Sequence, residues 1–491
     1  MSTLSKQDIQ EVIKIIQTLY LEDNIPWICG YSGGKDSTAI VQLVWEALSQ
    51  LPETKRHKKV HVISTDTLVE SPVVALWANT SLERMKENAR KGYLPIIPHR
   101  LTPQTSNTYW VNLIGRGYPY PRKNFRWCTD RMKIEPSNTF IKKILDAESE
   151  AILVLGSRKA ESATRRAVME GYEKKRYRDH LSPNGSFPNS YIFTPIENWT
   201  NDNVWQYLMQ IPNPWGHSNK ELLAMYSGAS ADGECPLVFD TGTPSCGNSR
   251  FGCWVCTLVT EDKSMAAMIQ NDEEKSWMLP LLDFRNDIAT MGDPSLDRKR
   301  RDFRRMNGKL TWHHGRLVHG PYTKETREEF LRKLLRAEKV VHENGPEEVK
   351  DVPLITQEEL QFIRKIWLEE KHEFDDRLPL IYEEETGKVY EDNTIYGNKY
   401  YGAAEWDLLK EVCESLYPKE TLLLEMQSSI LDIESKSSAM SQRRNIKKRI
   451  EEIIVKCYFT DEDNAEEIEL ERRKRRGIID DVLNDEDIID E

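Results

Sequence analysis

The first 210 residues alternate short apolar runs with longer stretches in which apolar side chains recur every three or four positions. The short runs lie at 25–29, 60–64 and 151–155, and the helical stretches lie at 38–47 and around 72–91 and 134–147. Runs of this length are typical of buried strands, and a period of 3.6 is typical of amphipathic helices. The alternation predicts an α/β fold, a doubly wound parallel sheet with helices on both faces.

Each predicted strand is followed by a turn rich in polar residues or glycine, at 32–37, 64–70 and 156–166. Because the carboxyl ends of parallel strands meet at one edge of a sheet, we expect these three turns to lie side by side. Ligands of doubly wound sheets bind at that edge. The turns are therefore the expected walls of a binding site.

Beyond residue 210 the pattern changes. Residues 211–262 are rich in Gly, Pro, Ser and Cys, and a basic run at 298–316 precedes a helix whose capping box is Thr356 and Glu359. Helical periodicity returns at 421–459, and the charge block after residue 460 is expected to be mobile or bound to a partner. The sequence thus predicts four regions: 1–210, 211–262, 263–420 and 421–491.

Composition and charge exclude few functions. Of the 491 residues, 39% are hydrophobic and 30% are charged, and no run approaches the roughly 18 apolar residues of a membrane span. Eight cysteines without a secretion signal predict a reducing, cytoplasmic setting. The net charge of −12 is concentrated in the last 31 residues, which hold 14 acidic and 5 basic side chains. A local basic patch elsewhere remains possible, so a nucleic acid partner is not excluded.

The first predicted turn has the chemistry of a phosphate site. The stretch "SGGKDS", 32–37, stands between a strand and a helix, so it directs several backbone N–H groups and the positive end of the helix dipole at one spot. It is not the Walker pattern, which needs four residues between its glycines. The alternative is a glycine turn with capping serines.

The same stretch resembles the PP-loop of ATP pyrophosphatases and of the family of PAPS (phosphoadenosine phosphosulfate) reductases. The resemblance implies that ATP binds here and that Lys35 offsets the charge that develops as the α–β bond breaks. It implies that the pyrophosphate is held by the backbone or hydroxyl groups of Ser32, Gly33, Gly34, Asp36 and Ser37. Lys35 and Asp36 are then catalytic candidates, and Asp36 or Asp66 is a candidate contact for Mg²⁺.

Two further segments resemble this family. "VISTDTLVESP", 62–72, is similar to the turn that holds the adenosine, which implies roles for Asp66 and Thr67. "LGSRKAESATRRAVM", 155–169, is similar to an arginine segment in which Arg158, Arg165 and Arg166 would bind phosphate. The alternative for the arginines is a salt-bridged helix face. Trp199 and Trp205, in the family's closing segment, are expected to pack rather than to react.

Four cysteines lie close together in the sequence: Cys235, Cys246, Cys253 and Cys256. The Cys253-x-x-Cys256 pair has the spacing that one metal ion or cluster needs. Structural zinc is one interpretation. Similarity to PAPS-reductase-like relatives with a [4Fe–4S] cluster implies the other, with these four thiols as ligands.

Cys128 is a fifth candidate, in the family segment "RWCT". Arg126, Arg131 and Lys133 surround it in sequence and are expected to lower its pKa and favour the nucleophilic thiolate. Cys128 would then carry a persulfide, or it would replace Cys235 or Cys246 as a cluster ligand. Three others are expected to be structural thiols: Cys29, Cys413 and Cys457.

Together, the PP-loop, "RWCT" and the cysteine module resemble the DndC family, sulfurtransferases of bacterial DNA phosphorothioation, over about residues 1–385. The resemblance implies that ATP, split to AMP and pyrophosphate, activates a DNA backbone phosphate so that sulfur replaces a non-bridging oxygen. It also implies a cysteine desulfurase as sulfur donor, other proteins of the phosphorothioation system as partners, and no membrane. The basic run 298–316 is the candidate DNA track.

Three other functions share parts of this pattern. One is a reductase of PAPS or APS, which reduces a sulfonucleotide and does not split ATP. Another is a tRNA-thiolating enzyme, which shares the loop and often the cluster. The last is a scaffold subunit that binds a nucleotide without catalysis, against which the intact Lys35 and Ser37 argue.

Overall fold

A computed structural model describes residues 4–229, 252–313, 315–391, 401–438 and 445–475. Cys235 and Cys246, two of the predicted cluster ligands, lie outside these ranges. The chain divides into two compact units. Unit 1 comprises Met1–Gln104, Arg122–Arg285 and Val341–Val352, and unit 2 comprises Thr105–Pro121, Asn286–Val340 and Pro353–Glu491. The four regions suggested by composition are functional assignments and stay a prediction.

Unit 1 is built on a six-stranded sheet with the order β3-β2-β1-β4-β6-β5. Its strands are β1 Trp27–Gly30, β2 Val60–Thr65, β3 Ile96–Leu101, β4 Ala151–Val154, β5 Leu181–Pro183 and β6 Ser190–Phe193. All pairings within this sheet are parallel except that of β5 with β6. The chain winds outward from β1 in both directions, which confirms the predicted doubly wound sheet.

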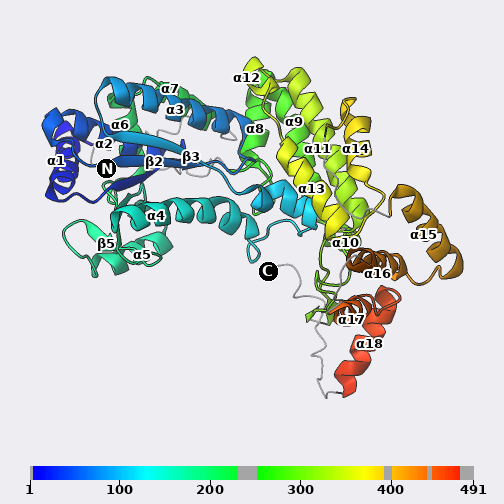
Figure 1. The fold of residues 1–491 in the computed structure, drawn as a ribbon. Helices are drawn as coiled ribbons and strands as arrows, with labels where there is room; N and C mark the ends of the chain where they lie inside the picture. The colour runs from blue at the N-terminus through cyan, green and yellow to red at the C-terminus, as the bar shows by residue number, and fades with distance from the viewer. Residues whose placement is uncertain (1–3, 230–251, 314, 392–400, 439–444, 476–491) are drawn as a thin grey trace. The chain divides into compact units, whose positions relative to one another are not determined.

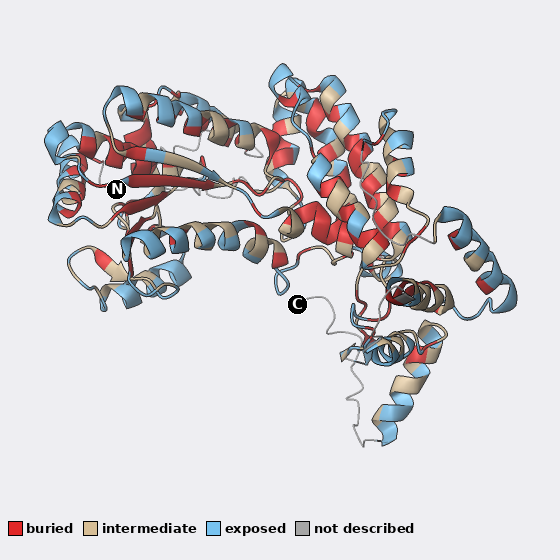
Figure 2. Ribbon diagram, in the orientation of Figure 1, coloured by how far each residue is buried: buried red, intermediate tan, exposed pale blue. Residues whose placement is uncertain are grey.

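Helices cover both faces of this sheet (Figure 1). One face shares a hydrophobic core with α1 Lys6–Glu22, α2 Lys35–Ser49, α3 Pro72–Lys91, α6 Asn201–Gln210 and α7 Asn219–Gly228, and the other packs against α4 Glu135–Glu148. Successive side chains of β1 alternate between the two cores: Trp27 and Cys29 point to the first, and Ile28 to the second. Figure 2 shows the central strands β1 and β2 as buried along nearly their whole length, whereas the edge strand β3 has exposed positions.

The elements predicted in the first 210 residues are confirmed to within a few residues. The helix expected around 72–91 is α3, and the one expected around 134–147 is α4. Trp199 and Trp205 are buried in the first core, as expected of packing residues. Unit 1 also contains α5 Ala163–Glu173, α8 Lys263–Asn271 and α12 Glu347–Lys350, and the chain crosses between the units within α9 Leu279–Ile288 and α11 Lys324–Asn344.

Unit 2 is mostly helical. Its elements include α10 Pro294–Lys299, α13 Gln357–Glu369, α14 Arg377–Thr386, α15 Ala403–Leu416, α16 Leu423–Ser438, α17 Ile446–Lys456, α18 Glu462–Arg475 and the short hairpin of β7 Trp312–His313 and β8 Arg316–Leu317. The predicted capping box is present: the Thr356 hydroxyl accepts from the Glu359 N–H, and the Glu359 carboxylate accepts from the Thr356 N–H.

Four arginines of the basic run at 298–316, Arg298, Arg300, Arg301 and Arg304, are paired with acidic groups inside unit 2. Arg298 donates to Glu462 (2.7 Å), Arg300 to Asp287 (2.9 Å), and Arg304 to both Asp302 (2.7 Å) and Glu425 (2.6 Å). The Arg304 side chain is 3% exposed. Lys299, Arg305 and Lys309 of the same run are exposed and have no acidic partner within the described ranges, so the role of this run as a DNA track stays a prediction.

Part of the charged tail is helical, and the expectation that it is mobile or bound to a partner stays a prediction. Residues 462–475 form α18, whose Glu462 accepts from Arg298 and from His319 (2.9 Å). Residues 476–491 lie outside the described part of the chain. Across the described ranges, the longest helices carry too many polar side chains to span a bilayer.

Candidate nucleotide pocket and adjoining cysteines

A pocket of about 710 Å³ lies at the carboxyl ends of β1, β2 and β4 in unit 1. All three predicted turns contribute to its wall, which confirms that they lie together. Seven of the predicted site residues line it: Ser32, Gly34, Lys35, Asp36, Ser37, Asp66 and Arg158. Its volume falls in the range of small-molecule and cofactor sites.

The first turn folds into a compact loop because glycine permits its backbone. Gly33 has φ +74°, in the left-handed region that favours glycine, and Gly34 is the N-cap of α2 without a side-chain cap. The Ser32 N–H donates to Ser37 Oγ (3.1 Å), which itself donates to the Gly34 carbonyl (3.0 Å). The start of α2 therefore opens into the pocket, where its N–H groups and dipole favour an anion.

Two glycines allow other elements to approach this loop. A Cβ on Gly33 would lie 3.2 Å from Cδ1 of Trp77 on α3, so the loop packs directly on that helix. A Cβ on Gly156 would lie 3.1 Å from the backbone carbonyl of Asp36. The turn after β4 is thus held against the first turn of α2, a role for Gly156 that the sequence reasoning missed.

Opposite charges meet at the start of α2. Asp36 accepts from Arg158 Nε (2.7 Å) and lies 3.5 Å from the ammonium of Lys35. Arg158 is 4% exposed, and it also donates to the Trp199 carbonyl (3.3 Å). Arg158 and Lys35 therefore both pair with the Asp36 carboxylate. The phosphate oxygens of a bound nucleotide would compete with this carboxylate for the two cations.

Tyr226, from α7, lines the pocket beside the start of α2. The sequence reasoning did not identify it. Its hydroxyl accepts from the Lys35 N–H (3.3 Å), and the Lys35 ammonium lies 5.2 Å from its ring centroid. Burial raises the pKa of Tyr226 to about 12, so the hydroxyl stays protonated. Nothing local marks this tyrosine, because 191 residues separate it from Lys35.

The other predicted binding residues are placed differently. Asp66 lines the pocket but already accepts from Arg100 Nε (3.0 Å) and from the Leu68 N–H (2.8 Å). Thr67 is fully buried and does not line the pocket, and Arg165, which does not line it either, pairs with Glu161, which does. The adenosine and phosphate roles of these residues stay predictions.

The Cys253–Cys256 turn lies directly behind the turn that follows β2. The Cys256 N–H donates to the Cys253 carbonyl (3.0 Å), and Cys253 forms an antiparallel bridge with Glu70. Cys253 Sγ lies 3.3 Å from Thr67 Oγ1 and 3.8 Å from Glu70 Oε1. Since Glu70 also lines the pocket, one short segment borders both the pocket and the thiols.

The expected thiolate character of Cys128 is wrong. Burial raises the pKa of Cys128, and the neighbouring Cys256 raises it further. Of the three bases expected to lower it, Lys133 does lower the pKa of Cys128 but does not outweigh burial, and its ammonium also pairs with Glu70 (3.5 Å). Burial raises the pKa of Cys253, so this thiol is protonated at neutral pH; were it ionised, as a metal ligand would be, its charge would raise the pKa of Lys133, whose ammonium would then be its counter-ion.

Glu70 and Lys133 were also missed from the sequence, although both line the pocket. A useful signal was the position of Glu70, four residues after Asp66 in the second turn. Lys133 gave a weaker signal, because only the fold brings it from a π-helical turn, Thr129–Ile134, to the strand edge.

The donor set is suitable for a soft metal centre. Cys253 and Cys256 present two thiols from one turn, and Cys128 is close enough to interact electrostatically with Cys256. Over the described ranges, no three Cys, His, Asp or Glu side chains converge as a metal site. The predicted ligands Cys235 and Cys246 lie outside those ranges. The [4Fe–4S] assignment therefore stays a prediction.

Comparisons with known proteins agree with this arrangement for the N-terminal part of the chain. Residues 26–214 match the profile of the phosphoadenosine phosphosulfate reductase domain. Two uncharacterized proteins of Methanocaldococcus jannaschii are each 26% identical, over 206 and 178 residues, or 42% and 36% of this chain. The chain spans about a third of the length of these curated relatives, 36% and 34%.

Solved structures with some likeness include a phosphoadenylyl-sulfate reductase from Candida auris, at 14% identity and a TM-score of 0.25, covering 43% of this chain and 91% of that one. They also include the U34-tRNA thiolase NcsA from Methanococcus maripaludis with its [4Fe–4S] cluster, at 15% identity and a TM-score of 0.27, covering 44% and 72%. The profile match and the glycine loop at the pocket lead to one conclusion. Residues 26–214 form a PAPS-reductase-like PP-loop domain.

Proposed function

We propose that this protein is an ATP-dependent sulfurtransferase that replaces a non-bridging oxygen of a DNA backbone phosphate with sulfur. The observation that carries the proposal is the shared segment after β2. Glu70 lines the nucleotide pocket and also lies beside Cys253 Sγ (3.8 Å). An activating nucleotide would therefore lie beside the group of thiols to which Cys128, the proposed sulfur carrier, belongs through its interaction with Cys256.

In the first step, a non-bridging oxygen of a DNA phosphate attacks the α-phosphorus of ATP. The bond from the α-phosphorus to the bridging oxygen breaks, and pyrophosphate leaves with its charge. The amides at the start of α2 and the ammonium of Lys35 are placed to stabilise that charge. Mg²⁺ bound to the triphosphate would neutralise part of it, with Asp36 as the proposed contact.

In the second step, the terminal sulfur of a persulfide on Cys128 attacks the adenylated DNA phosphorus. AMP leaves with the oxygen that attacked ATP, and the DNA is joined to Cys128 through a disulfide. Two equivalents of a thiol reductant then release the DNA phosphorothioate and the free Cys128 thiol as the reductant is oxidised to its disulfide. A cysteine desulfurase would reload Cys128.

The cluster has a separate place in this proposal. Cys253 and Cys256 would hold a [4Fe–4S] centre, with Cys235 and Cys246 as further ligands. Such a centre would fix the position of the thiol-bearing turn and would supply a site that polarises sulfur. Lys133, which faces Glu70 and responds to charge on Cys253, would balance the negative charge of the ligands.

The test supplies ATP, a persulfide donor and either duplex DNA or tRNA, and measures AMP, pyrophosphate and sulfur in the digested nucleic acid by mass spectrometry. The proposal expects sulfur in DNA dinucleotides and loss of this product in Cys128→Ser. The matched control is Cys413→Ser, because Cys413 is a buried thiol of α15 in unit 2. Sulfur in tRNA alone, or sulfite released from PAPS, would replace the proposal with another function.

A further inference from the structure

We propose that α5 and the residues that follow it bind the phosphate backbone of the nucleic acid substrate beside the nucleotide pocket. The inference rests on the proposed function only in taking a nucleic acid as the acceptor. α5, Ala163–Glu173, buries none of its residues, as Figure 2 shows. Its Val168 is 52% exposed. A helix that contributes nothing to the core offers its surface to solvent or to a partner.

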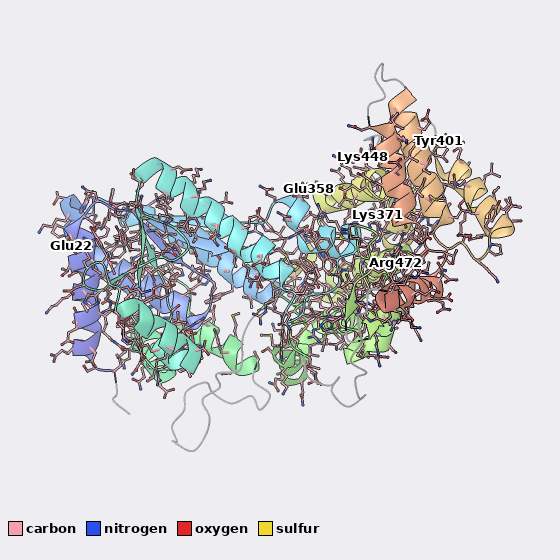
Figure 3. All side chains as sticks on the ribbon, turned by 90° about the horizontal axis from the view of Figure 1, so that it is seen from below. Glu22, Glu358, Lys371, Tyr401, Lys448 and Arg472 are labelled. Carbon is pink, nitrogen blue, oxygen red and sulfur yellow. The ribbon has the colours of Figure 1, made fainter. Side chains whose placement is uncertain are left out.

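The charge of this segment is strongly positive. Residues 158–178 contain eight Lys or Arg and three Glu side chains. Five of the bases have acidic partners: Arg158 with Asp36, Lys159 with Glu173, Arg165 with Glu161, Arg176 with Glu197, and Arg178 with Asp23 and with Glu22, which Figure 3 labels at the end of α1.

The three remaining bases are Arg166, Lys174 and Lys175. All three are exposed, and none has an acidic partner within the described part of the chain. Cations without internal partners keep their full attraction for phosphate, which is the electrostatic basis of binding to nucleic acids. They differ in this respect from the arginines at 298–304, which are paired inside unit 2.

The three free bases continue from the rim of the pocket. Ala160 and Glu161 line the pocket, and α5 begins two residues later. A helical rise of about 1.5 Å per residue places Arg166 and Lys174, which caps α5, about 12 Å apart along the helix, the rise of roughly three to four nucleotides in one strand. A strand that follows α5 would therefore bring one of its phosphates to the mouth of the pocket.

An aromatic side chain adds a contact for an unpaired base. Tyr177 is 69% exposed, and its ring stacks on Tyr191 with centroids 5.0 Å apart and planes 28° apart. Basic side chains interleaved with exposed aromatic rings are typical of surfaces that bind single strands. The nucleic acid would thus be held by phosphate contacts on α5 and by stacking just beyond it.

The experiment measures binding of the full chain to labelled duplex DNA, single-stranded DNA and tRNA at several salt concentrations. The variant is Arg166→Gln/Lys174→Gln/Lys175→Gln. The matched control is Lys6→Gln/Lys14→Gln/Lys86→Gln, three exposed lysines of α1 and α3 that do not line the pocket. Losing three phosphate contacts should reduce the salt slope by about 2.7 and weaken binding at 0.1 M salt on the order of 10²-fold.

The outcomes separate this inference from the proposed function. Weaker binding and a lower salt slope in the α5 variant, with the control variant unchanged, support the proposed binding surface. An equal loss of affinity for DNA and tRNA shows that the surface recognises the phosphate backbone. A loss of affinity for one of them alone identifies the substrate. If the α5 variant keeps the wild-type nucleic acid affinity and salt slope, the inference is overturned. It is also overturned if the α5 surface binds an acidic protein and none of the three nucleic acids. Absence of sulfur in DNA would instead overturn the proposed function and leave the measured surface intact.

Discussion

Replacing Lys35 with methionine should slow pyrophosphate release far more than it weakens ATP binding. The Lys35 ammonium already lies 3.5 Å from Asp36 Oδ2 and over the ring of Tyr226. Two unit charges at about 4 Å interact with about 4 kcal/mol at an effective dielectric constant of 20. When ATP binds, Lys35 exchanges its ion pair with Asp36 for a contact of similar strength with a phosphate oxygen. The net contribution of Lys35 to the free energy of ATP binding is therefore small.

The charge on the leaving pyrophosphate grows only in the transition state, where Lys35 can act without losing an equal contact. Removing one such donor in an enzyme typically lowers kcat on the order of 10²–10³-fold, or about 2.7–4 kcal/mol. We expect this loss for Lys35→Met, with ATP affinity reduced by less than about tenfold.

The assay pairs single-turnover release of pyrophosphate with equilibrium binding of a non-hydrolysable ATP analogue. Lys159→Met is the matched control, because Lys159 pairs with Glu173 and does not line the pocket. If Lys35→Met kept more than about a tenth of the wild-type rate, or if Lys159→Met lost as much, the assigned role of Lys35 would be refuted.

Four further predictions concern packing, ion pairing, pH dependence and stacking. Gly156→Ala should weaken ATP binding and lower the melting temperature, because the new Cβ would lie 3.1 Å from the Asp36 carbonyl and overpacking costs about 1–3 kcal/mol. Arg304→Met should lower the free energy of unfolding in urea by about 1.5–3 kcal/mol, since Glu425 loses its charged hydrogen bond from Arg304 (2.6 Å) and keeps its ion pair with Lys456 (2.8 Å), but should not change the salt slope of DNA binding. Burial alone would raise the pKa of Glu425, but Arg304 and Lys456 outweigh it and hold the pKa at about 2. The ionised Glu425 carboxylate therefore stabilises the fold above pH 4.5, and this stabilisation is lost as the pH falls toward 2. Glu425→Gln should reduce this acid-dependent loss of the free energy of unfolding. Tyr177→Ala should weaken binding of single-stranded DNA by about 1–3 kcal/mol and leave duplex binding unchanged.

Each of these has a contrary result. Wild-type nucleotide affinity in Gly156→Ala would show that the β4 turn is not pressed on α2. A lower salt slope in Arg304→Met would make the basic run a contact for DNA after all. An acid profile of Glu425→Gln identical to that of the wild type would remove the pH argument, and equal losses for single strands and duplexes would remove the stacking role of Tyr177.

The sequence predicted most reliably what depends on neighbours along the chain. The turns at 32–37, 64–70 and 156–166 could be placed at one edge of the sheet, because strand and helix periods are local and parallel strands end together. The glycine conformations of the first turn followed from the same reasoning, and so did the capping box at Thr356.

What the sequence could not predict depends on contacts between distant segments. Tyr226 and Lys133 reach the pocket only through folding, and no local pattern marks either one. Arg298 and Arg304 appeared free because two of their acidic partners, Glu462 and Glu425, lie more than 100 residues away. The pKa of Cys128 was misjudged because adjacent bases are visible in a sequence and burial is not.

The most direct test is a stoichiometric one. With DNA, ATP and a persulfide donor present, released AMP and pyrophosphate and the sulfur recovered in DNA dinucleotides are measured in the same reaction. The account predicts equal amounts of all three, each abolished by Lys35→Met. Sulfur transfer to DNA that proceeds without ATP, or ATP cleavage whose yield does not follow sulfur in DNA, would contradict it.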